Sequence, residues 1–349
     1  MIFDRDSWKR ICDGFFIRDC TIGFEDGRLG FHMVEETDDH HLDDGWKTRF
    51  VSVRMNEPME SRFFTLTGGN LSFTTISSAW APSQTEFVMA DVLCRVWSYK
   101  PKTYKGNEPE VPFDGKGYGL PDVGEIGSTI NKVVRVGTSV YGVGTPLRVF
   151  QRMPNQQWHE HKGIPIPKEF KSKDRETVLN AISNSTFFDL AGFSEADMYA
   201  VGDAGIVWHF DGKLWKQIAF PTNLRLQTVT CAGDGNVYIT DIRGSLWCGR
   251  GAEWKQTAKS DRSLPFADAG WFDGRLWCAN DYGMMVFEGK TFVQAHQAKV
   301  NPIPTEVALL SHRFDISPDG KQMLVCGGHG AAMNRDGKWE VLFNGDDFQ

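Results

Sequence analysis

The chain has 349 residues and a formal net charge of −7, with 24% charged and 41% hydrophobic residues. This composition excludes wholesale disorder, and the lack of any run of about 18 apolar residues excludes a transmembrane helix. The first residues, Met1 to Arg10, lack the apolar core of a signal peptide, so we predict a cytoplasmic protein without a membrane partner. A mildly acidic chain also argues against nucleic acid as a partner.

One sequence pattern recurs along the chain, in degenerate copies over residues 20–165 and in clear copies over residues 187–343. Its central glycines Gly205, Gly244 and Gly283 follow one another at intervals of 39 residues. Seven copies are recognisable, of which the first is the weakest; they begin at residues 24, 87, 141, 199, 237, 276 and 324. Self-similarity with a period of about 40 residues is typical of repeat architectures.

Each copy predicts four short strands. In one of them, β-branched and aromatic runs predict strands over 226–231, 237–240 and 245–248, and a fourth strand that carries Trp254 and ends near Ala258. Units of four strands and about 40 residues are the blades of β-propellers. We therefore predict an all-β fold in which residues 1–349 form a single β-propeller domain. Seven blades are preferred over six, and an N-terminal strand is expected to close the ring by joining the last blade.

The same architecture accounts for two excesses in the composition, 13% aromatic residues and 36 glycines. A single four-stranded sheet cannot bury both of its faces, so large flat side chains are expected to fill the space between stacked blades. The tryptophans are therefore predicted to be core residues rather than a cofactor site. The glycines are expected at tight turns.

The strings Met198-Tyr199-Ala200-Val201-Gly202-Asp203-Ala204-Gly205 and Asp211-Gly212-Lys213-Leu214-Trp215 resemble the repeats of bacterial WD40/YVTN/BNR-like propellers, including the photosystem II stability factor type. The resemblance is clear over 187–343 and weak over 70–165. It implies a propeller fold and says little about function. The sequence departs from the related Asp box of sialidase-type propellers, because no Ser or Thr stands two residues before Asp211.

The densest acidic stretch of the chain is the segment 35–44. We predict that it attracts a cationic protein partner by long-range electrostatics, the alternative being a solvated hairpin loop within the first blade. The acidic residues assigned to this surface are Glu35, Glu36, Asp38, Asp39, Asp43 and Asp44.

Two other segments interrupt the repeats. Residues 100–128 are rich in Pro, Gly and Lys and are predicted to be a long loop or an insertion between blades. Residues 160–186 are predicted to be an insertion with a short helix over 174–183. The second segment carries Lys168, Lys171 and Lys173, which we assign to the partner-binding surface. A solvated insertion without a partner is the alternative.

No cofactor or metal is expected. The seven cysteines include no Cys-x-x-Cys pair and are predicted to be reduced, mostly buried thiols. His40 and His41 are adjacent and would point to opposite sides of an extended segment, and His159 and His161 also lack a chelating spacing typical of zinc sites.

The sequence holds no Gly-x-Ser-x-Gly elbow and no P-loop, and the innermost strands predicted at 187–190 and 226–230 carry few charges. We therefore predict a monomeric, non-enzymatic, protein-binding propeller, and specifically an immunity protein that neutralises a cognate bacterial toxin. A cationic toxin domain would associate quickly with an acidic inhibitor. Two alternatives remain open: an assembly or scaffold factor for a protein complex, and a glycosidase or lyase acting at the central channel.

Overall fold

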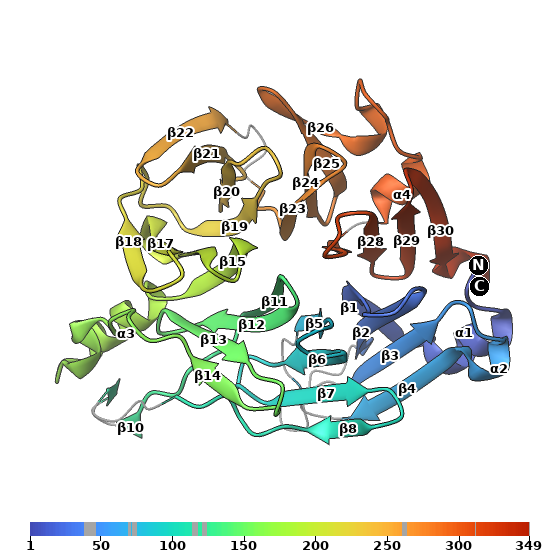
Figure 1. The fold of residues 1–349 in the computed structure, drawn as a ribbon, viewed down its shortest axis with the longest axis horizontal. Coiled ribbons are helices and arrows are strands. Elements are labelled where there is room, and N and C mark those ends of the chain that lie inside the picture. The colour runs from blue at the N-terminus through green and yellow to red at the C-terminus, as the bar shows by residue number, and fades with distance from the viewer. Residues whose placement is uncertain are drawn as a thin grey trace.

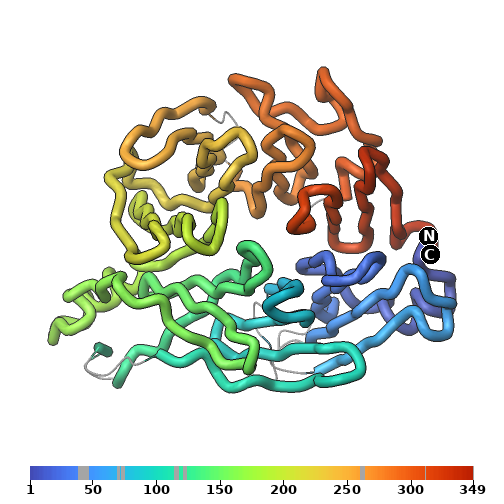
Figure 2. The backbone as a smooth tube through the Cα atoms, viewed as in Figure 1, coloured from blue at the N-terminus to red at the C-terminus, as the bar shows by residue number. Residues whose placement is uncertain are grey.

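The computed structural model describes residues 1–37, 47–68, 71, 75–113, 118–120, 124–259, 264–310 and 312–348. It consists mostly of β-strands, arranged as seven four-stranded antiparallel sheets in a ring (Figure 1), which is a seven-bladed β-propeller. The two termini lie side by side at the edge of the ring (Figure 2). The predicted fold class and the preferred count of seven blades are therefore confirmed, and the weak first copy is a blade.

We number the blades 1 to 7 in chain order, and each takes its four strands in chain order, from the axis outward. The blades are β1 (Phe15–Ile22), β2 (Arg28–Glu35), β3 (Thr48–Arg54), β4 (Phe63–Gly68); β5 (Thr75–Ala79), β6 (Glu86–Ala90), β7 (Val96–Lys100), β8 (Tyr104–Asn107); β11 (Lys132–Val136), β12 (Ser139–Gly144), β13 (Arg148–Arg152), β14 (Trp158–Glu160); β15 (Phe187–Ser194), β16 (Asp197–Gly202), β17 (Val207–Phe210), β18 (Trp215–Ile218); β19 (Leu226–Cys231), β20 (Val237–Asp241), β21 (Leu246–Arg250), β22 (Glu253–Ala258); β23 (Asp268–Phe272), β24 (Arg275–Asn280), β25 (Gly283–Glu288), β26 (Thr291–Gln294); and β27 (Arg313–Ile316), β28 (Gln322–Gly327), β29 (Gly330–Arg335), β30 (Lys338–Asn344).

The remaining elements are short. They are the helices α1 (Arg5–Ile11), α2 (Met59–Arg62), α3 (Arg175–Ser183) and α4 (Thr305–Leu309), the 3-10 turns η1 (Lys168–Lys171), η2 (Asp203–Gly205), η3 (Ala295–Gln297) and η4 (Gly345–Phe348), and the two-stranded sheet of β9 (Gly119–Leu120) and β10 (Gly124–Glu125). The helix expected over 174–183 is present as α3, because the Asp174 carboxylate caps its N-terminus by accepting the Thr177 N–H at 2.9 Å. Among the described residues, no helix is long and apolar enough to cross a membrane.

The prediction for residues 100–128 was partly wrong. The fourth strand of blade 2, β8, lies inside this segment, and β9 and β10 follow it. The strand is short and reads Tyr-Lys-Gly-Asn, with alternating half-buried and exposed residues, so it lacks the apolar run by which the other strands were recognised. The rest of the segment connects blade 2 to blade 3.

The hydrophobic core lies between the blades. The first strands of neighbouring blades contact one another all the way round the ring, including β27 with β1. Large aromatic side chains fill the spaces further out; Trp277, for example, is 1% exposed and packs in the cluster shared by blades 6 and 7. The aromatic residues therefore act as core, as stacking of sheets requires.

The ring closes without the expected strand exchange. Blade 7 takes all four strands from the continuous stretch 313–344, so the prediction that an N-terminal strand joins it was wrong. Instead, the Ile2 N–H donates to the Leu342 carbonyl at 2.8 Å, and Phe3 meets Phe343 edge to face at 5.0 Å. Trp8 of α1 stacks on Phe348 at 4.7 Å. The N-terminal segment thus closes the ring by side-chain packing and one backbone hydrogen bond.

The two ends of the ring differ in their connections. At one end, here called the turn face, short turns join the first strand to the second and the third to the fourth; the longest connection there runs over 55–62. The other end, here called the loop face, carries the connections between blades and those between second and third strands. The long connections begin and end there, namely 36–47, 108–131, 161–186 and 295–312. Propellers present binding residues on such loops, held by a rigid scaffold.

A fully buried charge network joins blade 3 to blade 2. Arg152 of β13 is 1% exposed and reaches the carboxylates of Glu86 and Glu108 and the amide oxygen of Gln84. Its Nε lies 2.9 Å from a Glu108 oxygen. Removing one partner of such a network leaves the others charged and desolvated.

We expect Arg152→Ala to lower the free energy of unfolding by about 3–5 kcal/mol, because it leaves the buried carboxylate of Glu108 without its cation and that of Glu86 with only Lys100, at 3.9 Å. Denaturant unfolding followed by fluorescence measures the loss. The matched control is Lys162→Ala, since the Lys162 side chain is 84% exposed in its ion pair with Glu160 and should cost less than about 1 kcal/mol. A loss for Arg152→Ala as small as that of the control would contradict the assignment.

Candidate functional site

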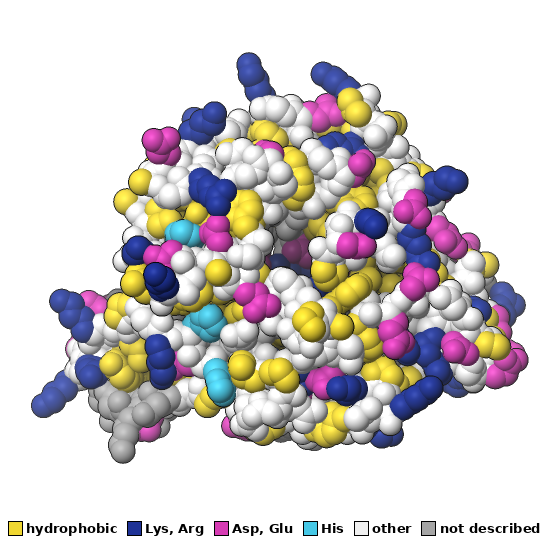
Figure 3. Space-filling view, in the orientation of Figure 1, with side chains coloured by type: hydrophobic (Ala, Val, Ile, Leu, Met, Phe, Trp, Pro, Cys, Tyr) yellow, Lys and Arg dark blue, Asp and Glu magenta, His cyan; other side chains and the backbone are white. Residues whose placement is uncertain are grey.

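A polar funnel runs along the axis of the ring. Its cavity is about 360 Å³ in volume and is lined by residues from the first strands of all seven blades. Figure 3 shows acidic and basic side chains inside the hollow at the centre of the molecule. The charged lining residues are Asp19, Asp189, Asp268, Asp315, Lys132 and Arg135. The two innermost strands named from the sequence do carry few charges, with Asp189 alone between them, but four of the other first strands add five charged residues to the lining.

The four aspartates of the funnel make the same two hydrogen bonds. One carboxylate oxygen accepts the N–H of the next residue in its own strand, at 2.9 to 3.2 Å. The other accepts an N–H from the first strand of the following blade, in the pairs Asp19 with Ile76 (3.0 Å), Asp189 with Val229 (3.0 Å), Asp268 with Phe314 (3.4 Å) and Asp315 with Ile22 (2.7 Å). We call these four side chains the seam carboxylates. Each one accepts a hydrogen bond from a backbone N–H of the following blade that is not used in the strand ladder of that blade.

Irregularities in the strand register set the direction of two of these side chains, Asp19 and Asp189. The register between β1 and β2 shifts just before Asp19, and that between β15 and β16 shifts just before Asp189. A β-bulge places an extra residue in one strand and redirects the side chain that follows it. The seam between blades 2 and 3 uses a hydroxyl instead, since Thr75 accepts the Val133 N–H at 2.8 Å.

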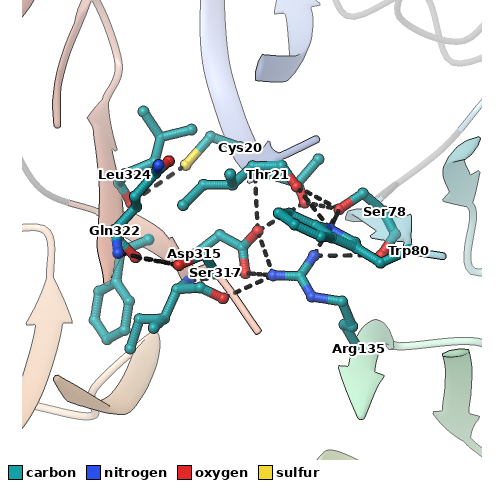
Figure 4. Close-up of polar contacts among 12 residues, drawn as sticks. Cys20, Thr21, Ser78, Trp80, Arg135, Asp315, Ser317, Gln322 and Leu324 are labelled. Carbon is teal, nitrogen blue, oxygen red and sulfur yellow. Dashed lines mark hydrogen bonds and ion pairs between the residues drawn. The ribbon is translucent and has the colours of Figure 1, made fainter. Parts of the chain in front are cut away.

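Three cations neutralise the seam carboxylates across the axis. Lys132 of blade 3 lies 2.9 Å from Asp189 and 3.0 Å from Asp268. Arg313 of blade 7 donates to the Ala267 carbonyl at 2.6 Å and acts on Asp19 and Asp268 through its charge. Arg135 reaches from blade 3 to Asp315 of blade 7 at 2.8 Å, beside Ser78 (Figure 4). The charges of the funnel are therefore paired mainly with one another.

Burial and neighbouring charge act in opposite directions on these groups. Burial raises the pKa of Asp19 to about 6, against the opposing effect of Arg313, and burial also raises the pKa of Asp189. The pKa of Lys132 is raised because Asp189 and Asp268 together outweigh the effect of burial, which lowers it. Carboxyl groups with raised pKa values inside a cavity are also found at catalytic sites. If the protein had an enzyme activity, the funnel would be the expected active site.

The predicted partner-binding residues lie on the loop face where the structure describes them. Glu35 forms an ion pair with Lys47 at 3.0 Å, and Glu36 lies 3.1 Å from His329. Asp38, Asp39, Asp43 and Asp44 lie outside the described residues, as do His40 and His41.

The three predicted lysines lie on a small lobe at the edge of the ring. Lys168, Lys171 and Lys173 are exposed, and Lys171 lies over the Tyr118 ring at 4.5 Å, where η1 and α3 pack against β9. Figure 1 shows this lobe across the ring from blade 1, so the structure does not bring the lysines together with Glu35 and Glu36.

Sequence reasoning missed a cavity of about 500 Å³ between blades 1 and 2. It lies at the loop face, because Thr48 begins β3 and Asn107 ends β8 and both line it. Its remaining lining residues are Phe50, Leu66, Gly68, Leu71, Met89, Arg95, Val96, Trp97, Glu108 and Glu110. No motif marked it, because these residues come from two copies of the repeat that are both degenerate.

Within the described part of the chain, no three His, Cys, Asp or Glu side chains are grouped in a way that could hold a metal ion. His159 is exposed, whereas His161 is half-buried beside Gln151 at 3.3 Å, and burial lowers its pKa. All seven cysteines are free thiols, and five of them are buried.

No family model matches the sequence. One curated protein is similar to it: the immune protein Tsi7 of Pseudomonas aeruginosa is 38% identical over 140 residues. The alignment covers 40% of this chain and 42% of Tsi7, so it spans less than half of either protein.

Solved structures support the fold at low sequence identity. PorZ of Porphyromonas gingivalis, a surface component of the type-IX secretion system, matches with a TM-score of 0.58 and 11% identity over 93% of this chain and 38% of PorZ. YCF48 of Cyanidioschyzon merolae matches with a TM-score of 0.54 and 11% identity over 93% and 96% of the two chains. Virginiamycin B lyase of Staphylococcus aureus matches with a TM-score of 0.51 and 8% identity over 76% and 82%. At such identities the likeness concerns the propeller fold alone.

The raised pKa of Asp19 predicts a pH dependence of stability. With a folded pKa of about 6 and an unfolded value of 3.8, this carboxyl binds a proton more readily in the folded state, so its contribution to stability is full below pH 3.8 and is lost as the pH rises through 6. Between pH 5 and 7 the change amounts to about 1 kcal/mol.

We expect Asp19→Asn to remove this contribution, so that the difference in unfolding free energy between pH 5 and pH 7 becomes smaller by about 1 kcal/mol than in the wild type. Urea unfolding at the two pH values gives both differences. Glu253→Gln is the control, because Glu253 is exposed on the outermost strand of blade 5 and should leave the dependence unchanged. An unchanged pH dependence in Asp19→Asn would show that Asp19 does not titrate in this range.

Proposed function

We propose that this protein is an immunity protein, a non-enzymatic propeller that binds a toxin of bacterial origin and neutralises it. The observation that carries the proposal is the 38% identity to the immune protein Tsi7 over 140 residues. An identity of this size over four-tenths of the chain exceeds what the shared fold produces, since the structural neighbours reach only 8 to 11%.

The structure supports a binding role in two ways. The funnel charges are engaged in joining blades, as the seam carboxylates and Lys132 illustrate, which leaves few of them for chemistry on a substrate. The long connections that depart from the repeat all begin and end on the loop face, where a rigid ring presents their described residues.

The proposed partner is a cationic toxin domain. We propose that the protein is a monomer, forms a single propeller domain and binds the toxin in the reducing cytoplasm. The acidic residues of segment 35–44 would speed the encounter by electrostatic steering, and the lysines of the lobe would contact the partner at the other side of the loop face. The chain has a net charge of −7, and its cysteines are free thiols, which is compatible with a reducing compartment.

Two other functions would use other parts of the molecule. An assembly factor would also bind through the loop face but would protect no cell from a toxin. An enzyme would act in the funnel with Asp19 as an acid or base, and Asp19→Asn would then abolish its activity. The following experiment separates both from an immunity role.

A bacterial strain that lacks this protein should be killed or arrested by its toxin-bearing wild-type siblings and rescued by the wild-type gene in trans. We expect rescue to weaken when Asp38, Asp39, Asp43 and Asp44 are all changed to Asn. The association rate with the co-purified partner should then fall about tenfold at low ionic strength, because four charges that attract a cationic surface are removed. Competition assays and surface plasmon resonance measure the two effects.

The control variant removes the same number of charges from the turn face, by Glu60→Gln, Glu253→Gln, Asp273→Asn and Asp336→Asn, all of which are exposed positions. It should rescue fully and associate at nearly the wild-type rate. A deletion strain as resistant as its parent would refute the immunity role. Equal slowing by both quadruple variants would refute the assignment of the acidic segment as the docking surface.

A further inference from the structure

The cavity between blades 1 and 2 combines an aromatic wall with acidic groups. Phe50, Met89 and Trp97 line its inner side and are 1 to 5% exposed, so they are fixed by the core behind them. Glu108 and Glu110 line it from the segment that follows β8. Aromatic faces and carboxylates are the two groups that bind an organic cation favourably.

Among the described residues, one negative charge around this cavity has no counterion. Glu108 is held by Arg152 at 2.9 Å, and the lining residue Arg95 is held by Asp91 at 2.7 Å. Arg152 is shared with Glu86, which Lys100 also approaches to 3.9 Å. The three cations thus face Asp91, Glu86 and Glu108, whereas Glu110, which is exposed, has no hydrogen-bond or ion-pair partner among the described residues.

From these contacts we infer that the cavity between blades 1 and 2 receives one basic side chain, Lys or Arg, of a protein partner. One positive charge would complete the charge balance at Glu110, and the stem of the side chain would pack along Phe50 and Trp97. The identity of that partner as a toxin rests on the proposed function, but the recognition of a basic side chain does not.

Position and charge together favour a protein as the source of that side chain. The cavity opens at the loop face, and Val34, which precedes the acidic Glu35, pairs with Thr48, which lines the cavity. A basic surface steered to Glu35 would therefore arrive next to the cavity. An anionic partner would meet Glu110 with a like charge, which disfavours binding.

The test uses the full chain and two fluorescein-labelled Gly/Ser nonapeptides, one with three arginines and one with three citrullines at the same positions. Citrulline keeps the shape of arginine and removes its charge. In buffer with 150 mM salt, fluorescence anisotropy should show the arginine peptide binding about tenfold more tightly than the citrulline peptide. Glu110→Gln should weaken the binding of the arginine peptide about threefold, and Glu110→Lys should weaken it about tenfold.

The matched control is Glu253→Lys, which makes the same charge change at an exposed residue of the turn-face end of β22 and should alter binding less than twofold. Thermal unfolding midpoints within about 2 °C of the wild type would show that the Glu110 variants are folded. Equal binding of the two peptides, or equal loss from Glu110→Lys and Glu253→Lys, would overturn the inference. Because the assay contains no toxin, these outcomes are independent of whether the deletion strain is sensitive to its siblings.

Discussion

The structure depends on the hydrogen bond by which the first strand of one blade accepts a backbone N–H from the first strand of the next. Each first strand pairs with its own blade on one side only, so its inner edge would leave donors unpaired in a narrow, partly desolvated channel. Asp19, Asp189, Asp268 and Asp315 satisfy one such donor each with a carboxylate oxygen. The ring thereby acquires polar joints with defined geometry, in addition to the nondirectional packing of aromatic side chains.

This solution brings negative charge to the axis, and the cations there follow from it. Lys132 bridges Asp189 and Asp268, and Arg135 crosses to Asp315, so blade 3 is tied to its neighbour blade 4 and, across the axis, to blades 6 and 7. At the closing seam, Asp315 receives the Ile22 N–H while Phe3 and Trp8 pack outside it. Such a network is expected to replace the strand exchange that the sequence suggested, because it provides directional contacts between the first and last blades.

The blades could be predicted from the sequence, whereas the charged contacts along the axis could not. A spacing of 39 residues between glycines such as Gly205 and Gly244 locates the blades, because each glycine lies in the turn between the second and third strands of its blade and has a positive φ. The seam carboxylates leave a local signal in the sequence, an Asp flanked by apolar residues as in Phe188-Asp189-Leu190 and Phe314-Asp315-Ile316, but this pattern does not by itself distinguish a seam residue from any other residue of a strand. Their counterions could not be predicted, since Lys132 lies 136 residues from Asp268 and Arg135 lies 180 residues from Asp315.

A ring held together at its axis leaves its loop face free to vary, which matters for recognition. The lobe with Lys168 and Lys171 and the cavity with Glu110 are both on that face but at different blades, and they carry opposite charge. A partner that covers both must present a basic side chain to one and acidic or neutral surface to the other. The reverse orientation would place the basic side chain against the lysines of the lobe, so charge would select one orientation of the partner even where the individual contacts are weak.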